Sequence, residues 1–284
     1  MPRAQRLAAL DAALPLLACP VCAGRLGRED GALACPQGHR FDVARTGTVN
    51  LAGRAAPRNA DTPAMVAARE SFLATAAYRP LADALIEVLT SSDMAGDPWA
   101  PRCVAEFGAG PGYYLRAVLD ALSGPAVGLA ADVSGAAARR AAARGLAAIV
   151  ADTWERWPLR DACLDAVMCV FAPRNPSEAA RVLRPGGRFV LATPQADHLA
   201  EVRHRLGLMG VHDDAGGRAR AALAHAGLET VAVRPLRYRR NLGRDDVDNL
   251  VGMGPNAYHA PPAADAAVRV TVAVEISLCA KAPG

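Results

Sequence analysis

Four residues near the N-terminus have the types and the spacing of a metal site. Cys19 and Cys22 form a Cys-x-x-Cys pair, and Cys35 and His39 follow after about a dozen residues. Zinc prefers a tetrahedron of thiolate and imidazole ligands, and two short turns can each present two of them to one ion. Four protein ligands leave no open position for water or substrate. The pattern therefore predicts a small zinc ribbon whose ion is structural and not catalytic.

A glycine-rich turn further along the chain is the second candidate site. Gly108, Gly110 and Gly112, with Pro111 between the last two, follow the apolar run Cys103–Phe107 and precede a helical pattern. Glycines allow backbone torsions that a side chain forbids, and they let a ligand approach the main chain. The spacing differs from the Gly-x-Gly-x-x-Gly of dinucleotide-binding proteins. It resembles instead the turn of Rossmann-like, class I S-adenosylmethionine (SAM)-dependent methyltransferases.

Two acidic residues support a nucleoside cofactor at this turn. Asp132 ends the second apolar run, about twenty residues beyond the glycines, where a carboxylate can accept hydrogen bonds from both ribose hydroxyls. Asp152 follows the third run, where that class of fold places a contact to the adenine amine. Either acid alone could cap a helix, and Asp132 shortly precedes Ser134 and a helical pattern. The turn and the two acids together predict a nucleoside cofactor, and the resemblance of the turn to that of the methyltransferases implies that this cofactor is SAM.

Alternating strands and helices must position these residues. Strands are expected over seven apolar runs, which are Cys103–Phe107, Ala126–Ala131, Ala147–Ala151, Asp165–Phe171, Arg188–Thr193, Glu229–Pro235 and Val268–Cys279. Helical patterns lie between most of them, and this alternation predicts an α/β fold with a doubly wound parallel sheet. Ligands of such sheets bind outside the carboxyl ends of the strands. The glycines and both acids follow strand ends, so we expect them to share one site.

The net charge of +4 is concentrated in the zinc segment. Residues 1–60 hold eight arginines and four acidic residues, a difference of four that accounts for the whole excess. Such an excess suits a phosphate-bearing partner. A compositional bias explains it equally well, because the chain is rich in Ala and Arg and Lys281 is its only lysine. We find no secretory leader and no run of about 18 apolar residues, so we expect a cytoplasmic protein without a membrane partner.

The N-terminal part of the chain is expected to form a smaller module. A helix is predicted over residues 6–17, short strands around Leu33 and Phe41, and a linker over residues 52–63. Helical spacing then resumes in two segments broken near Pro80. We therefore expect two domains, a zinc-binding RNA-recognition domain at residues 1–60 and a SAM-dependent methyltransferase domain at residues 61–284.

An ordered set of motifs makes the chain resemble the RlmA family of 23S rRNA (guanine-N1)-methyltransferases over nearly its whole length. The motifs are Cys19–Cys22, Cys35–Asp42, Gly47–Leu51, Asp61–Leu73, Tyr78–Leu81, the glycine turn, and Thr193-Pro194 followed by His198-Leu199. Two further stretches, Val170–Pro176 and Met253–His259, are most similar to the tylosin- and mycinamicin-resistance branch. That branch acts on guanine 748 in a domain II hairpin of 23S rRNA. The resemblance thus implies an enzyme of rRNA processing that confers macrolide resistance.

The resemblance also implies roles for single residues. It places structural Zn²⁺ on Cys19, Cys22, Cys35 and His39, and cofactor contacts on Tyr78, Gly110, Pro111 and His198. Pro111 departs from the acidic residue of some relatives, and Glu106 stands where relatives usually have Asp. A homodimer would fit the family, although no pattern in the sequence indicates one.

The loop after the fourth strand is expected to face the transferred methyl group. We hypothesise that Phe171 packs on the guanine base, while Arg174 or Asn175 contacts the edge of the base or a phosphate. Phe171 could equally be a core residue at a strand end. Guanine N1 carries a proton at neutral pH, so a base or solvent must remove it. No catalytic residue that could act as this base is identified in the sequence.

Two other functions share part of this pattern. A SAM-dependent enzyme that tailors an antibiotic would have the same cofactor site but would need no basic zinc module. A noncatalytic zinc- and RNA-binding protein would need no cofactor acids. The intact ribbon argues against the first alternative, and the intact acids argue against the second.

Overall fold

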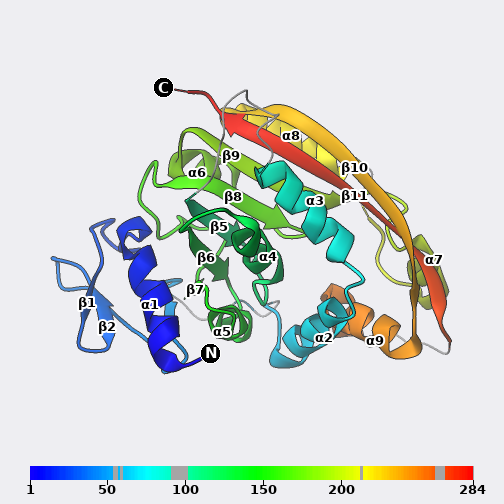
Figure 1. Ribbon diagram of the computed structural model, residues 1–284, viewed down its shortest axis with the longest axis horizontal. Helices are drawn as coiled ribbons and strands as arrows, with labels where there is room; N and C mark the ends of the chain where they lie inside the picture. Colours follow the sequence, from blue (N-terminus) through cyan, green and yellow to red (C-terminus); the bar gives the residue numbers. More distant parts are fainter. Residues whose placement is uncertain (54–56, 58–59, 91–101, 212–213, 260–265, 284) are drawn as a thin grey trace.

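An eight-stranded sheet forms the centre of the molecule (Figure 1). The computed structural model describes residues 1–53, 57, 60–90, 102–211, 214–259 and 266–283. The strand order is β10-β11-β9-β8-β5-β6-β7-β4. The strands are β4 (Thr48–Asn50), β5 (Cys103–Phe107), β6 (Val127–Asp132), β7 (Ala147–Val150), β8 (Leu164–Val170), β9 (Leu183–Pro194), β10 (Leu228–Leu242) and β11 (Val268–Lys281). All seven strands predicted from apolar runs are thereby confirmed.

The sheet is mixed and not purely parallel as predicted. β4 to β9 pair in parallel, whereas β11 pairs antiparallel with β9 on one side and with β10 on the other. After β10 the chain passes through α9, and Val268 at the start of β11 then pairs with Leu242 at the end of β10, so β11 runs back along β10. An antiparallel pair needs no crossover helix to carry the chain back to the other edge.

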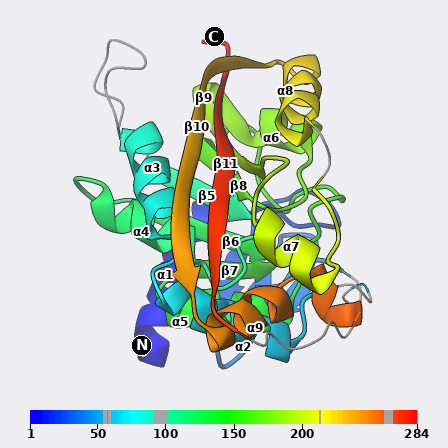
Figure 2. The same ribbon diagram turned by 90° about the vertical axis from the view of Figure 1, so that its right-hand side faces the viewer.

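Helices cover both faces of the sheet, as expected for an α/β fold. The helices are α1 (Arg3–Ala13), α2 (Pro63–Ala74), α3 (Arg79–Thr90), α4 (Tyr113–Ala121), α5 (Gly135–Ala143), α6 (Pro176–Val182), α7 (Ala200–Leu206), α8 (Ala215–His225) and α9 (Arg244–Gly252). One hydrophobic cluster joins α3, α4 and α5 to one face of the sheet, and a second joins α1, α6 and α8 to the other. Figure 2 shows α3 and α4 on one side of the strands and α6 and α8 on the other. Side chains alternate between the clusters along β9, with Val190 and Ala192 in the first and Phe189 and Leu191 in the second.

The zinc segment packs into the second of these clusters. Its own small antiparallel sheet consists of β1 (Gly27–Glu29), β2 (Ala32–Ala34) and β3 (Arg40–Asp42). Leu10 of α1 and Leu33 of β2 are fully buried in the same cluster as Phe107 and Ile149 of the large sheet. β4, which precedes residue 60, is itself the edge strand of the large sheet beside β7. The division into domains at residue 60 stays a prediction, and in the structure the two parts share one core.

The segment between the ribbon and the first helix of the methyltransferase part is only partly described. Of the linker predicted over residues 52–63, residues 54–56 and 58–59 lie outside the described part of the chain. Thr62 ends this segment by capping α2, where its hydroxyl accepts a hydrogen bond from the Met65 amide at 3.2 Å. The predicted break near Pro80 falls between α2 and α3, with Pro80 in the first turn of α3. Within the described residues, no helix has the length and apolarity that crossing a bilayer requires.

Candidate functional site

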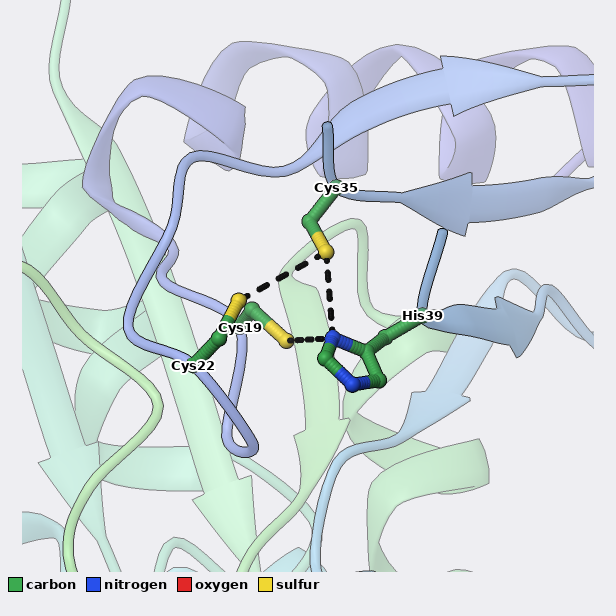
Figure 3. Close-up of side chains that lie close together, drawn as sticks. All are labelled: Cys19, Cys22, Cys35 and His39. Carbon is green, nitrogen blue, oxygen red and sulfur yellow. Dashed lines mark hydrogen bonds between the residues drawn. The ribbon is translucent and has the colours of Figure 1, made fainter. Parts of the chain in front are cut away.

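The four predicted zinc ligands converge on one point (Figure 3). Their ligand atoms all lie within 4.8 Å of one another. Cys22 Sγ lies 3.6 Å from Cys35 Sγ, and His39 Nδ1 lies 3.3 Å from Cys35 Sγ and 3.7 Å from Cys19 Sγ. Metal bonds of ~2.3 Å to sulfur and ~2.0 Å to nitrogen give tetrahedron edges of ~3.5 to ~3.8 Å. The donor set and its spacing therefore fit a tetrahedral zinc ion bound through His39 Nδ1.

Two turns hold these ligands in place. The Cys19 amide donates to the carbonyl of Gly24 at 2.8 Å, and the Gly38 amide donates to the carbonyl of Cys35 at 2.9 Å. Burial acts to raise the pKa of Cys35, but hydrogen bonds from the backbone and ring of His39 outweigh it and lower the pKa to about 6. A thiol with a lowered pKa is deprotonated at neutral pH and is ready to bind a cation.

The glycine turn lies where β5 meets α4 and has the backbone that the sequence predicts. Gly108, Gly110 and Gly112 have φ values of +68°, +54° and +74°, in the left-handed region that favours glycine. A Cβ on Gly108 would lie 2.4 Å from Ala172 Cβ, and one on Gly112 would lie 2.4 Å from a methyl group of Leu146. A larger residue at Gly108 would therefore displace Ala172, and the left-handed backbone disfavours one at both positions. The contact at Gly108 also places the turn against the loop that follows β8.

The two predicted cofactor acids lie at the ends of neighbouring strands, β6 and β7. Asp132 accepts the Gly110 amide at 2.8 Å with one carboxylate oxygen and the Ser134 amide at 2.8 Å with the other. Ser134 caps α5, because its hydroxyl accepts a hydrogen bond from the Ala137 amide at 3.3 Å. Asp132 is therefore not the capping residue of this helix. Burial raises the pKa of Asp132. Asp152 holds its own loop by accepting the Trp154 amide at 2.9 Å.

Glu106 is a buried carboxyl group below the turn. It accepts the Leu115 amide at 3.1 Å and so satisfies one backbone donor in the first turn of α4. Burial is the main cause that raises its pKa to about 8, from an ordinary value of 4.5. The carboxyl group is therefore largely protonated at neutral pH and braces the turn from inside the core.

Three rings from distant parts of the sequence meet beside the turn. The ring centroids of Tyr78 and Phe171 are 5.8 Å apart, and those of Phe171 and His198 are 5.4 Å apart. His198 Nδ1 accepts the Ala273 amide at 3.3 Å, which assigns the ring proton to Nε2 as donor to the Tyr78 hydroxyl at 3.2 Å. Burial lowers the pKa of His198 to about 4, so this imidazole is neutral at neutral pH.

The predicted substrate loop adjoins these rings. Phe171 has a φ of +53°, uncommon for a bulky residue, and its side chain is partly exposed. Phe171 is therefore neither a regular strand residue nor a fully buried one. Asn175 caps α6 by accepting the Glu178 amide at 3.3 Å, and Arg174 precedes it in the same loop. Contacts from Phe171, Arg174 and Asn175 to a base or phosphate stay predictions.

One charged pair beside the turn was given no role from sequence. Arg69 of α2 pairs with Asp61 at 2.5 Å between Nη1 and Oδ2, and a Cβ on Gly110 would lie 3.1 Å from the same Nη1. Both residues belong to the motif Asp61–Leu73. The spacing of eight residues, with Arg69 about two helical turns beyond the start of α2, is the sequence feature that could have indicated this ion pair. The contact with Gly110 could not be foreseen from it.

Comparisons with known proteins agree with both parts of the site. A model described as the RlmA N-terminal zinc ribbon matches residues 17–52, and a methyltransferase domain model matches residues 104–187. The chain is 45% identical over 265 residues to a putative 23S rRNA (guanine-N1)-methyltransferase of Micromonospora griseorubida, covering 88% of this chain and 89% of the relative. It is 43% identical over 248 residues to the 23S rRNA (guanine(748)-N1)-methyltransferase of Streptomyces fradiae, covering 87% of each. A putative enzyme of Bacillus subtilis named for the same guanine-N1 reaction is 28% identical over 254 residues, covering 86% of this chain and 87% of the relative.

The zinc geometry predicts that the purified protein carries a single zinc ion. A Cys35→Ser variant should lose most of its zinc and melt at a lower temperature, because serine is a poor zinc ligand and bound metal stabilises the folded state. Metal analysis by mass spectrometry and thermal unfolding measure both effects. Cys163→Ser is the matched control, since this thiol donates to the carbonyl of Arg160 outside the cluster. Wild-type zinc content in the Cys35 variant would contradict the assignment.

The raised pKa of Glu106 predicts an unusual pH dependence of stability. Between pH 4.5 and about 8 the folded state holds a proton that the unfolded chain releases, so the free energy of unfolding contributed by this group falls as the pH rises. Glu106→Gln lacks this titration but keeps an oxygen for the Leu115 amide. Urea unfolding at several pH values should show the wild type losing stability relative to this variant up to pH 8. Glu229→Gln, at an exposed position of β10, should follow the wild type. Parallel curves for Glu106→Gln and wild type would refute the role of burial.

Proposed function

The chain belongs to the RlmA family of 23S rRNA (guanine-N1)-methyltransferases, and we propose that it transfers the methyl group of SAM to N1 of a guanine in 23S rRNA. The observation that carries the proposal is the joining of a Cys₃His zinc site and a methyltransferase glycine turn through one core. A methyltransferase that acts on a small molecule would not need the zinc site. A noncatalytic binding protein would not need the glycine turn. The sequences of the Micromonospora griseorubida and Streptomyces fradiae relatives align with this chain over 89% and 87% of their length.

The cofactor site is proposed to lie along the carboxyl ends of β5, β6 and β7. Gly108, Gly110, Pro111 and Gly112 would offer main chain to the ligand, Asp132 would accept from the ribose, and Asp152 would accept from the adenine amine. The carboxylate of Asp132 has two lone pairs on each oxygen, so its bonds to Gly110 and Ser134 leave acceptor capacity for the ribose. Tyr78 and His198 are proposed to close the other side of the site.

The rings beside the turn suit a planar base. The cofactor would supply the methyl group, and the chain must align guanine N1 with it. Phe171 is the exposed member of the cluster with Tyr78 and His198, and we propose that the guanine packs on it. His198 is not a suitable base, because its Nδ1 lone pair accepts the Ala273 amide and its Nε2 carries the proton. We therefore propose that the N1 proton leaves to solvent.

The zinc ribbon is proposed to grip the RNA. Two of its arginines are neutralised by neighbours, Arg40 by Glu29 at 2.7 Å and Arg28 by Asp11 at 3.5 Å. Arg25 and Arg45 are exposed, and the ion pairs of the described part of the ribbon involve Arg28 and Arg40 instead. Exposed guanidinium groups on the ribbon suit the phosphates of a folded RNA.

We also propose which guanine is methylated, where in the cell this takes place and in which oligomeric state. The Streptomyces fradiae relative is named for guanine 748, and we propose the same guanine here, in a domain II hairpin, with resistance to macrolides such as tylosin or mycinamicin as the result. Ribosomal RNA as substrate implies action in the cytoplasm. A homodimer is also proposed, supported by the exposed Val231 and Val233 on the edge strand β10.

Incubation with SAM labelled in its methyl group separates the candidate functions. We expect label in 23S rRNA and a primer-extension stop at one guanine of domain II, because an N1 methyl group blocks Watson–Crick pairing. Label in a macrolide would instead support antibiotic tailoring. Absence of transfer to either substrate would leave a noncatalytic binding protein.

Variants of the zinc ribbon test whether it binds the RNA while the methyltransferase part binds the cofactor. Replacing Arg25 and Arg45 together by Ala should raise the KM for RNA by about tenfold while the affinity for S-adenosylhomocysteine stays at the wild-type value. The matched control replaces the paired Arg28 and Arg40 and should have a smaller effect. A loss of cofactor affinity in the first variant, or equal KM values for both variants, would contradict an RNA-gripping ribbon.

A further inference from the structure

Arg69 lies directly on the glycine turn. Its Nη1 is 3.1 Å, and its Cδ 3.5 Å, from the point where a Cβ of Gly110 would stand. Gly110 is also the residue whose amide binds Asp132. The guanidinium group therefore borders the surface on which a ligand of this turn must lie.

Contacts from two directions hold the guanidinium group there. Nη1 pairs with Asp61 at 2.5 Å, and Nη2 donates to the carbonyl of Met253 at 2.6 Å, just after the end of α9. α2 and α9 lie side by side in both views (Figures 1 and 2). Asp61 is itself held, because its carbonyl accepts the Ser134 hydroxyl at 2.6 Å. The arginine is thus fixed in position before any ligand arrives.

The fixed guanidinium group has unused hydrogen-bonding capacity. An arginine offers five N–H donors, and the contacts with Asp61 and Met253 use one on each Nη. Among the residues that the structure describes, no other contact uses the Nε donor or the second donor on each Nη, so these donors are available to a ligand. About a quarter of the side chain is exposed, so a ligand can reach it.

The charges of the proposed cofactor determine which of its groups this arginine can bind. The sulfonium and the ammonium of SAM are positive, its adenine and ribose are neutral, and its carboxylate is the one anionic group. Resting on the function proposed above, we infer that Arg69 binds the carboxylate of the cofactor's methionine portion, with Asp61 and Met253 orienting the guanidinium group. Arginine suits this task because its planar fork matches a carboxylate. The motif Asp61–Leu73 thereby acquires a chemical role.

Calorimetric titration with two ligands tests this inference without turnover. One ligand is S-adenosylhomocysteine, and the other is S-adenosyl-3-thiopropylamine, which differs from it by lacking the carboxylate. Arg69→Gln should weaken binding of the first by about 10- to 100-fold, the range expected for a lost charged hydrogen bond, and change binding of the second less than about twofold. Arg79→Gln is the matched control, since Arg79 makes an exposed pair with Asp83 on α3 and should keep both affinities.

The outcomes distinguish this inference from the proposed function. Equal losses for both ligands, or no loss for S-adenosylhomocysteine, would overturn the role of Arg69 while wild-type binding upholds the cofactor site. Failure of the wild type to bind S-adenosylhomocysteine would overturn both. If Arg69→Gln does not fold, Arg69→Lys serves in its place. Lysine keeps the charge but not the fork, so it should lose affinity for the first ligand alone.

Discussion

One continuous hydrophobic core below the large sheet determines how the rest of the molecule is arranged. Leu10, Leu17 and Leu33 of the zinc segment are fully buried in it with residues of β5 to β9. Phe107 and Trp157 stack within it, with ring centroids 3.5 Å apart. The edge is closed by hydrogen bonds, including one from the Leu51 amide to the carbonyl of Val150 at 2.9 Å. The ribbon is therefore held in a fixed orientation to the sheet, and the chain leaves it beside the strand end that carries Asp152.

Backbone donors and buried carboxyl groups shape the turn above this core. Glu106 accepts from the start of α4, and Asp132 accepts from both Gly110 and Ser134. The bonds of Glu106 to Leu115 and of Asp132 to Ser134 join a strand end to the segment that follows it, and the bond of Asp132 to Gly110 joins the end of β6 to the glycine turn. These contacts hold the turn in its conformation. Such preorganisation lowers the cost of ordering the site when a ligand binds. The same logic extends to Arg69, which two neighbours hold in place at the rim.

Local sequence patterns predicted most of this architecture. The features that depend on contacts between distant parts of the chain could not be predicted from such patterns. The zinc ligands and the glycine turn could be predicted because their chemistry is encoded within a few residues. The reversal of β11 could not, because apolar runs do not record strand direction. The addition of β4 to the large sheet was also missed, since three residues carry too little periodicity. Arg69 meets Met253, which lies 184 positions away, and Tyr78 meets His198, 120 positions away. Only the family resemblance singled out Tyr78 and His198.

The central claim is that ribbon and methyltransferase sheet form one structural unit through their shared core. Hydrogen–deuterium exchange of the full-length protein, with zinc bound and after its removal by a chelator, tests this most directly. The shared core predicts that amides of β4 and β7 and of the segment around Trp157 lose protection together with those of β2 and β3. Loss of protection confined to residues 17–45, with β4 and β7 unchanged, would contradict it.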